Sequence, residues 1–116
     1  MLGIVTGLEL ESKLCLKAFT AKSETAPLIA CAAGTVDGAQ RAAKQLIEQG
    51  ATRLISFGVC GGLTAGIDTG DLILPKTVIM EGETLSLGGQ WFDQILNCLM
   101  ALKKILILIY LLSLDN

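Results

Sequence analysis

The sequence predicts an α/β domain with a mainly parallel sheet and flanking helices. Three observations support this: aliphatic runs alternate with stretches of helical periodicity, the runs end at glycines, and the apolar content is aliphatic. Hydrophobic residues make up 52% of the 116-residue chain but aromatic residues only 4%. Buried parallel strands are rich in Val, Ile and Leu, and strands that alternate with helices are joined by right-handed crossovers.

The N-terminus predicts a strand, a turn and a helix. The aliphatic run 2–6 closes at Gly7, and from Leu8 the hydrophobic pattern takes the helical period. This helix would bury an apolar stripe against the sheet. The stripe comprises Leu10, Leu14 and Ala18, with Cys15 and Phe19 beside it.

The next unit is a second strand and the helix with the clearest periodicity. The polar stretch 21–27 ends at Pro27, and residues 28–33 then predict a buried strand that ends at Gly34. A helix is predicted from Asp37 or Gly38 to Gln49, with Gly50 where a C′ glycine belongs. Its apolar positions are Ala39, Ala42, Ala43, Leu46 and Ile47.

Three further extended pieces follow. Residues 53–58 predict the third strand, and residues 71–80 predict a fourth, entered through Gly70 and bent at Pro75. Residues 83–87 are a candidate for a short additional strand before the glycine pair 88–89. The ends of the first three strands, at Gly7, Gly34 and Gly58, are expected at one edge of the sheet, where ligands collect in open α/β folds.

The last segment does not continue this pattern, because residues 95–114 are almost continuously aliphatic and have no single polar face. Three interpretations stay open: a buried terminal helix or strand, a membrane span, and the product of a reading-frame change near Asp93. Lys103 and Lys104 count against the span, at about 3 kcal/mol each in mid-membrane. We therefore divide the chain into a domain over 1–93 and an aliphatic tail over 94–116, and expect no membrane span.

Composition disfavours several classes of function. The net charge of −2 and the lack of a Lys/Arg cluster disfavour nucleic acid as a partner. No histidine is present and the cysteines form no CxxC pair, so metal sites and His-activated nucleophiles are disfavoured. We expect reduced thiols in a cytoplasmic protein. The N-terminal apolar run is interrupted by Glu9 and Glu11, which does not fit an export signal.

The glycine-rich stretch 56–63 is the strongest candidate for a binding site. It passes from a strand into Gly58, Gly61 and Gly62, so that backbone can approach a ligand closely. It does not match the GxGxxG or P-loop patterns, and a tight turn without a ligand is the alternative. Cys60 is disfavoured as a nucleophile, because no basic neighbour lowers its pKa.

Three motifs carry a resemblance to a known family. They are VTGLELE at 5–11, GVCGGL at 58–63 and GDLILP at 70–75, in this order. Together they resemble the superfamily of purine nucleoside phosphorylases and methylthioadenosine/S-adenosylhomocysteine nucleosidases, from residue 1 to about 93. The form of 56–63 and the short spacing from first helix to second strand most resemble the hopanoid-associated phosphorylase branch. The resemblance implies cleavage of the N-glycosidic bond of a purine nucleoside or adenosyl conjugate by phosphate or water.

The resemblance also implies roles for individual residues. Glu11 best matches the acid that positions or activates water, and Glu9 is the alternative if the alignment slips. Without the resemblance, such a glutamate is more often a solvated partner of the helix dipole. Gly7, Val59, Cys60 and Gly61 are the expected substrate-binding residues, and no cofactor is expected.

Two departures from the family pattern limit the expected activity. Ser56 and Val59 stand where phosphorolytic relatives hold phosphate, and neither supplies a positive charge, so phosphate as co-substrate is in doubt. The ribose-binding glutamate and the purine-protonating aspartate of the family come from a C-terminal half that 1–116 does not contain. We expect weak or no activity in this form. The alternative is a non-enzymatic α/β interaction module, and a homo-oligomer stays open.

Overall fold

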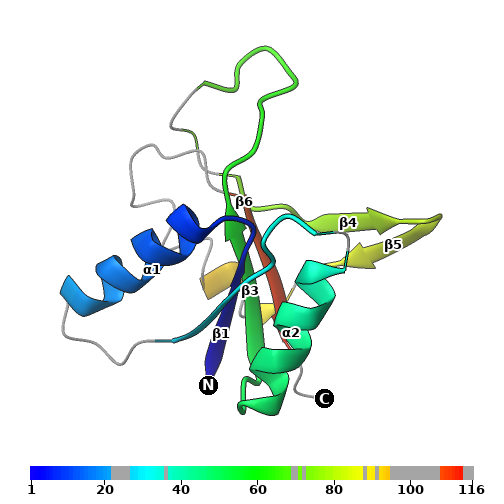
Figure 1. Ribbon diagram of the computed structural model, residues 1–116. Helices are drawn as coiled ribbons and strands as arrows, with labels where there is room; N and C mark the ends of the chain where they lie inside the picture. Colours follow the sequence, from blue (N-terminus) through cyan, green and yellow to red (C-terminus); the bar gives the residue numbers. More distant parts are fainter. Residues whose placement is uncertain are drawn as a thin grey trace.

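The computed structural model describes residues 1–21, 27–35, 37–68, 71, 73–87, 89–90, 92–94 and 108–113. Helices α1 and α2 and six strands have their bounds within these ranges, and residues 90 and 92–94 are also helical (Figure 1). In chain order they are β1 (Leu2–Thr6), α1 (Glu9–Ala21), β2 (Leu28–Cys31), α2 (Gly38–Glu48), β3 (Arg53–Gly58), β4 (Thr77–Met80), β5 (Glu83–Ser86) and β6 (Leu108–Ser113).

Four strands form one sheet in the order β2-β1-β3-β6. β1 lies at the centre and pairs in parallel with β2 and β3, so that Val5 is opposite Ala30 on one side and Ser56 on the other. The parallel core of three strands with flanking helices confirms the predicted α/β class. The predicted bounds of α2 hold almost to the residue, and Gly50 has the positive φ of 104° that a C′ glycine adopts.

Helix α2 covers one face of the sheet and forms the main core with it. Leu46 is 0% exposed and packs with Ala42 from the same helix and with side chains from all three parallel strands. Gly3 in β1 allows this close approach, since a Cβ there would lie 2.9 Å from Leu54 Cδ2 and 3.2 Å from Leu46 Cδ1. The core cluster consists of Val5, Ala30, Ala42, Leu46, Ala51 and Leu54.

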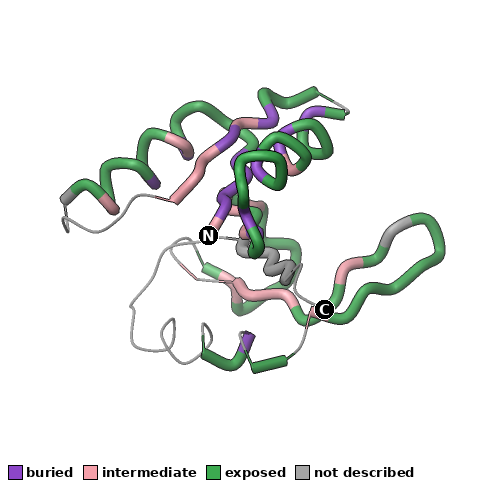
Figure 2. The backbone as a smooth tube through the Cα atoms, turned by 90° about the horizontal axis from the view of Figure 1, so that it is seen from below, coloured by how far each residue is buried: buried purple, intermediate pink, exposed green. Residues whose placement is uncertain are grey.

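Helix α1 lies on the opposite face, and its predicted stripe was wrong. Side chains alternate between the faces of a strand, so Thr6, which is hydrogen-bonded to Ser12 of α1, faces away from the Val5 side. Leu10 and Leu14 are 65% and 54% exposed, whereas Glu11 and Cys15 are buried. Most of α1 is accordingly exposed in Figure 2. The helix is turned so that Glu11, rather than the leucines, meets the sheet.

Strands β4 and β5 form a separate antiparallel hairpin that projects from the body (Figure 1). The short strand predicted at 83–87 is therefore confirmed, and in the described part of the fourth predicted piece the assigned strand is Thr77–Met80. Pro75 has no N–H to donate to a ladder, which limits the strand on its N-terminal side. Glu81 and Gly82 both have positive φ, as a two-residue hairpin turn requires. Gly70 and Gly88 lie outside the described residues.

Part of the aliphatic tail is a strand. β6 runs antiparallel to β3, with Leu111 opposite Ile55, and it covers the edge of the sheet that β3 would otherwise leave open. Residues 95–107 and 114–116 lie outside the described residues. Within the part of the chain that is described, neither helix has the length and hydropathy needed to cross a bilayer.

We predict that Leu46→Ala lowers the free energy of unfolding by about 2–5 kcal/mol, because it leaves a cavity between α2 and the sheet. The neighbouring Ile47 is 45% exposed, so Ile47→Ala should cost about 1 kcal/mol or less. Urea unfolding followed by circular dichroism measures both. Equal losses for the two variants would contradict the placement of α2.

Candidate active site

The carboxyl ends of β1, β2 and β3 lie side by side and form one end of the sheet, as predicted from Gly7, Gly34 and Gly58. We call this end the carboxyl edge. The Ala32 N–H donates to the Thr6 carbonyl at 2.7 Å, which ties the end of β2 to the end of β1. Thr6 is also in register with Phe57 of β3. The turns after all three strands therefore open on the same side of the molecule.

Glu11 occupies the centre of this edge. Its Oε2 accepts hydrogen bonds from the N–H groups of Gly7 and Leu8, each at 2.9 Å. Its Oε1 accepts a third bond, at 3.3 Å, from the N–H of Val59 just after β3. The residue is only 7% exposed. One carboxylate thus joins the first β-to-α turn to the glycine-rich loop.

The position of Glu11 in α1 explains these bonds. The first N–H groups of a helix have no partner within the helix, and an acid at the third helical position can reach back to them. α1 begins at Glu9, so Glu11 stands at this third position. Leu8, which precedes the helix, has no side-chain oxygen to accept from the amides of the first turn. The Glu11 carboxylate instead reaches back to the N–H groups of Leu8 and Gly7, and it also accepts from Val59.

Cys15 lies one helical turn behind Glu11 and is buried. Burial, with a smaller contribution from the negative charge of Glu11, raises the pKa of the Cys15 thiol. A thiol kept protonated in this way is a poor nucleophile. Cys15 therefore packs beneath the site and does not supply its chemistry.

The three loop glycines have different reasons to lack a side chain. A Cβ on Gly58 would lie 3.0 Å from Glu11 Oε1, and a Cβ on Gly62 would lie 3.1 Å from Ile67 Cγ2. A Cβ on Gly61 would meet nothing within 4 Å, and Gly61 does not have a positive φ. Packing of the described residues thus accounts for glycine at 58 and 62, whereas at 61 it leaves open space next to the backbone.

The loop is exposed beside the carboxylate. Val59 is 69% exposed, Cys60 is half-buried and Gly61 is exposed. An ionised carboxylate has about four acceptor positions, and the described residues occupy three of those of Glu11. The described residues leave one acceptor position, on Oε1, without a donor.

One comparison with known proteins gave a match. The family model described as the phosphorylase superfamily matches residues 11–95, which is more than half of the chain. The chain belongs to the phosphorylase superfamily. The matched region starts at Glu11 and includes the whole glycine-rich loop. Comparisons with curated proteins and with solved structures gave no match.

The structure brings most of the predicted site residues together and places one of them, Glu9, elsewhere. Hydrogen bonds bring Glu11, Gly7 and Val59 together, and Cys60 and Gly61 follow directly in the loop. Glu9, the alternative acid, lies instead in a groove between α1 and β2. No group of three or more His, Cys, Asp or Glu side chains among the described residues is arranged to hold a metal ion.

Two features of the site were not predicted from the sequence. The amide of Leu8 was not singled out, although the spacing from an N-cap to an acid three residues later could have indicated it. The close contact between Gly58 and Glu11 spans almost 50 residues. No local pattern reports such a contact.

We predict that Gly58→Ala lowers the free energy of unfolding by about 1–3 kcal/mol, because the new methyl group displaces the Glu11 carboxylate from its amides. Gly61→Ala should change it by no more than about 0.5 kcal/mol. Denaturant unfolding of the two variants makes the comparison. A similar loss for both would show that the loop is a tight turn in which every glycine is needed.

We predict that Glu11→Gln lowers the pKa of the Cys15 thiol, because the neighbouring negative charge is removed. The pKa should remain above its usual value, since burial is the larger cause. The pH dependence of iodoacetamide alkylation at Cys15, resolved by peptide mass spectrometry, measures the change. Cys60 in the same sample is the control, and an unchanged Cys15 profile would contradict the expected interaction.

Proposed function

We propose that this site cleaves the N-glycosidic bond of a purine nucleoside or an adenosyl conjugate. One observation carries the proposal: the Glu11 carboxylate is fixed against the open glycine-rich loop at the carboxyl edge of the sheet. Membership of the phosphorylase superfamily supports nucleoside cleavage as the class of reaction. The individual substrate and the roles of single residues are the proposal.

The geometry suits the charge that develops in such a reaction. As the glycosidic bond breaks, positive charge builds on the sugar and the transition state resembles an oxocarbenium ion. A carboxylate already held by backbone amides stabilises this charge without reorganising. Glu11 would act through Oε1, which faces Val59 and can hold a water molecule close to the anomeric carbon.

The glycine-rich loop would bind the sugar and base through its backbone. Gly61 leaves its main chain open to solvent, and Val59 and Cys60 precede it on the same loop. Backbone N–H and C=O groups fix the orientation of a ligand in many small-molecule sites. Gly7, whose amide holds Glu11, would border the same space.

Finer assignments rest on the resemblance in sequence. The loop form and the short connection between α1 and β2 support the hopanoid-associated phosphorylase branch. Neither Ser56 nor Val59 supplies a cation for phosphate, which favours water as the attacking group. We further propose that residues 1–116 alone are weakly active, because protonation of the leaving group is worth about 10²- to 10⁴-fold and no described residue is assigned to it.

We predict that the 116-residue chain binds adenine and methylthioadenosine in equilibrium dialysis. Adenine release, followed by chromatography with and without phosphate, should be at least about 10²-fold slower than that of an intact nucleosidase. Any release should be independent of phosphate and should be lost in Glu11→Gln. Glu48→Gln, an exposed acid at the end of α2, is the matched control and should behave as the unchanged chain.

These measurements also distinguish which part of the proposal is wrong if a result differs from the expected one. Loss of release in Glu9→Gln but not in Glu11→Gln would transfer the catalytic role to the groove residue. No binding of either ligand would contradict the proposed function itself. Release near the rate of an intact family member would contradict only the proposal of weak activity.

A further inference from the structure

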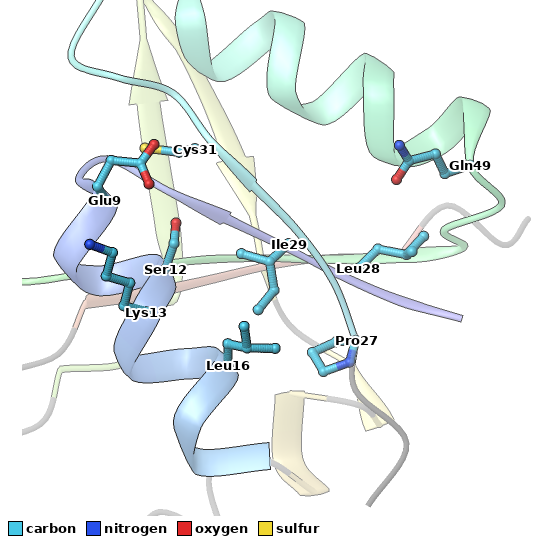
Figure 3. Close-up of a pocket in the computed structure, with 9 residues that line it drawn as sticks. All are labelled: Glu9, Ser12, Lys13, Leu16, Pro27, Leu28, Ile29, Cys31 and Gln49. Atoms are coloured by element: carbon cyan, nitrogen blue, oxygen red, sulfur yellow. The ribbon is translucent and has the colours of Figure 1, made fainter. Parts of the chain in front are cut away.

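A groove of about 530 Å³ runs along the open edge of β2, away from the candidate active site. α1 forms one wall with Glu9, Lys13 and Leu16, and Gln49 after α2 lies on the other side of the strand (Figure 3). Because its lining comes from both sides of β2, the groove follows the edge of the sheet. Among the described residues, no strand pairs with this edge.

The backbone of β2 points towards the groove with groups that no described strand pairs. In a parallel pair, the N–H and C=O of alternate residues point to the same neighbour. Ala32 donates to Thr6 and Ala30 is opposite Val5, so the even-numbered residues of β2 point their main chain at β1. The main-chain groups of Ile29 and Cys31 therefore point outward. An edge of this kind is a template for another strand.

The side of α1 that lines the groove carries opposite charges at successive turns of the helix. Glu9, Lys13 and Leu16 lie three to seven residues apart and so share one side of the helix. Figure 3 shows Glu9 beside Cys31, Lys13 one turn further along α1, and Leu16 toward Pro27. Glu9 and Lys13 are both exposed. If two copies of this helix face each other in opposite directions, Glu9 of one copy therefore lies near Lys13 of the other.

We propose that a second copy of this chain occupies the groove and that the two β2 strands pair antiparallel about a two-fold axis at Ala30. Ile29 of each copy then lies opposite Cys31 of the other, and each of these pairs exchanges two N–H···O=C bonds. The axis passes between the two Ala30 residues, which are small enough for the close approach of facing positions. The result is one continuous sheet that runs through both copies.

Charge complementarity favours a second copy as the occupant. The two-fold axis brings the Cys31 end of one strand to the Ile29 end of the other, and so brings Glu9 of each copy toward Lys13 of the other. The interface is isologous, since the same patch serves both partners. The other edge of the four-stranded sheet is β6, which follows β3. It shares neither the groove nor the charged wall, so β2 is the edge that pairs.

The test is analytical ultracentrifugation of the chain over a range of concentrations. The unchanged chain should show a reversible monomer–dimer equilibrium. Ile29→Pro removes an outward donor and leaves the hydrogen bonds to β1 in place, so it should abolish the dimer and retain the circular dichroism spectrum. Proline is tolerated at such edge positions, which keeps the variant folded.

Charge reversal gives a matched control for the geometry. Glu9→Lys and Lys13→Glu alone each bring like charges together, and each should weaken the dimer about tenfold or more. The double variant restores opposite charges and should recover the dimer. A chain that is monomeric at every concentration, or a dimer unaffected by Ile29→Pro and by both single reversals, would overturn the proposal. So would a folded monomer that instead binds an unrelated extended peptide at this edge.

Discussion

The buried carboxylate of Glu11 determines how the first helix sits on the sheet. A buried charge is tolerated only when it is hydrogen-bonded, and here three backbone amides from two different turns satisfy it. The three bonds fix the carboxylate between the first β-to-α turn and the loop after β3. The helix therefore turns its acid inward and leaves its leucines in solvent.

Much of the fold follows from local patterns in the sequence. The alternation of strands and helices, the bounds of α2 and the meeting of three strand ends could all be predicted, because they depend on hydrophobic period and on glycine. The orientation of α1 could not. Its pattern counts Leu10 and Leu14 as inward-facing, whereas the Glu11 carboxylate faces inward and bonds to the amide of Val59, distant in the chain, as well as to two local amides. The order of the strands and the separation of the β4–β5 hairpin likewise depend on contacts between distant segments.

The candidate site was predictable in its parts but not in its assembly. The glycine-rich stretch indicates close backbone approach. Only the structure distinguishes Gly58, which makes room for Glu11, from Gly61, which borders open space. Physical chemistry alone did not distinguish Glu11 from Glu9, and the resemblance ranked them. The structure gives the physical difference: one acid faces the loop, and the other faces a groove beside β2.

The bond from Val59 to Glu11 is the longest of the three that hold the carboxylate, and the only one that comes from the loop. A ligand that attracts the Val59 amide to itself would compete directly with Glu11 for this donor. Loop occupancy and the position of the carboxylate are therefore coupled through a single hydrogen bond.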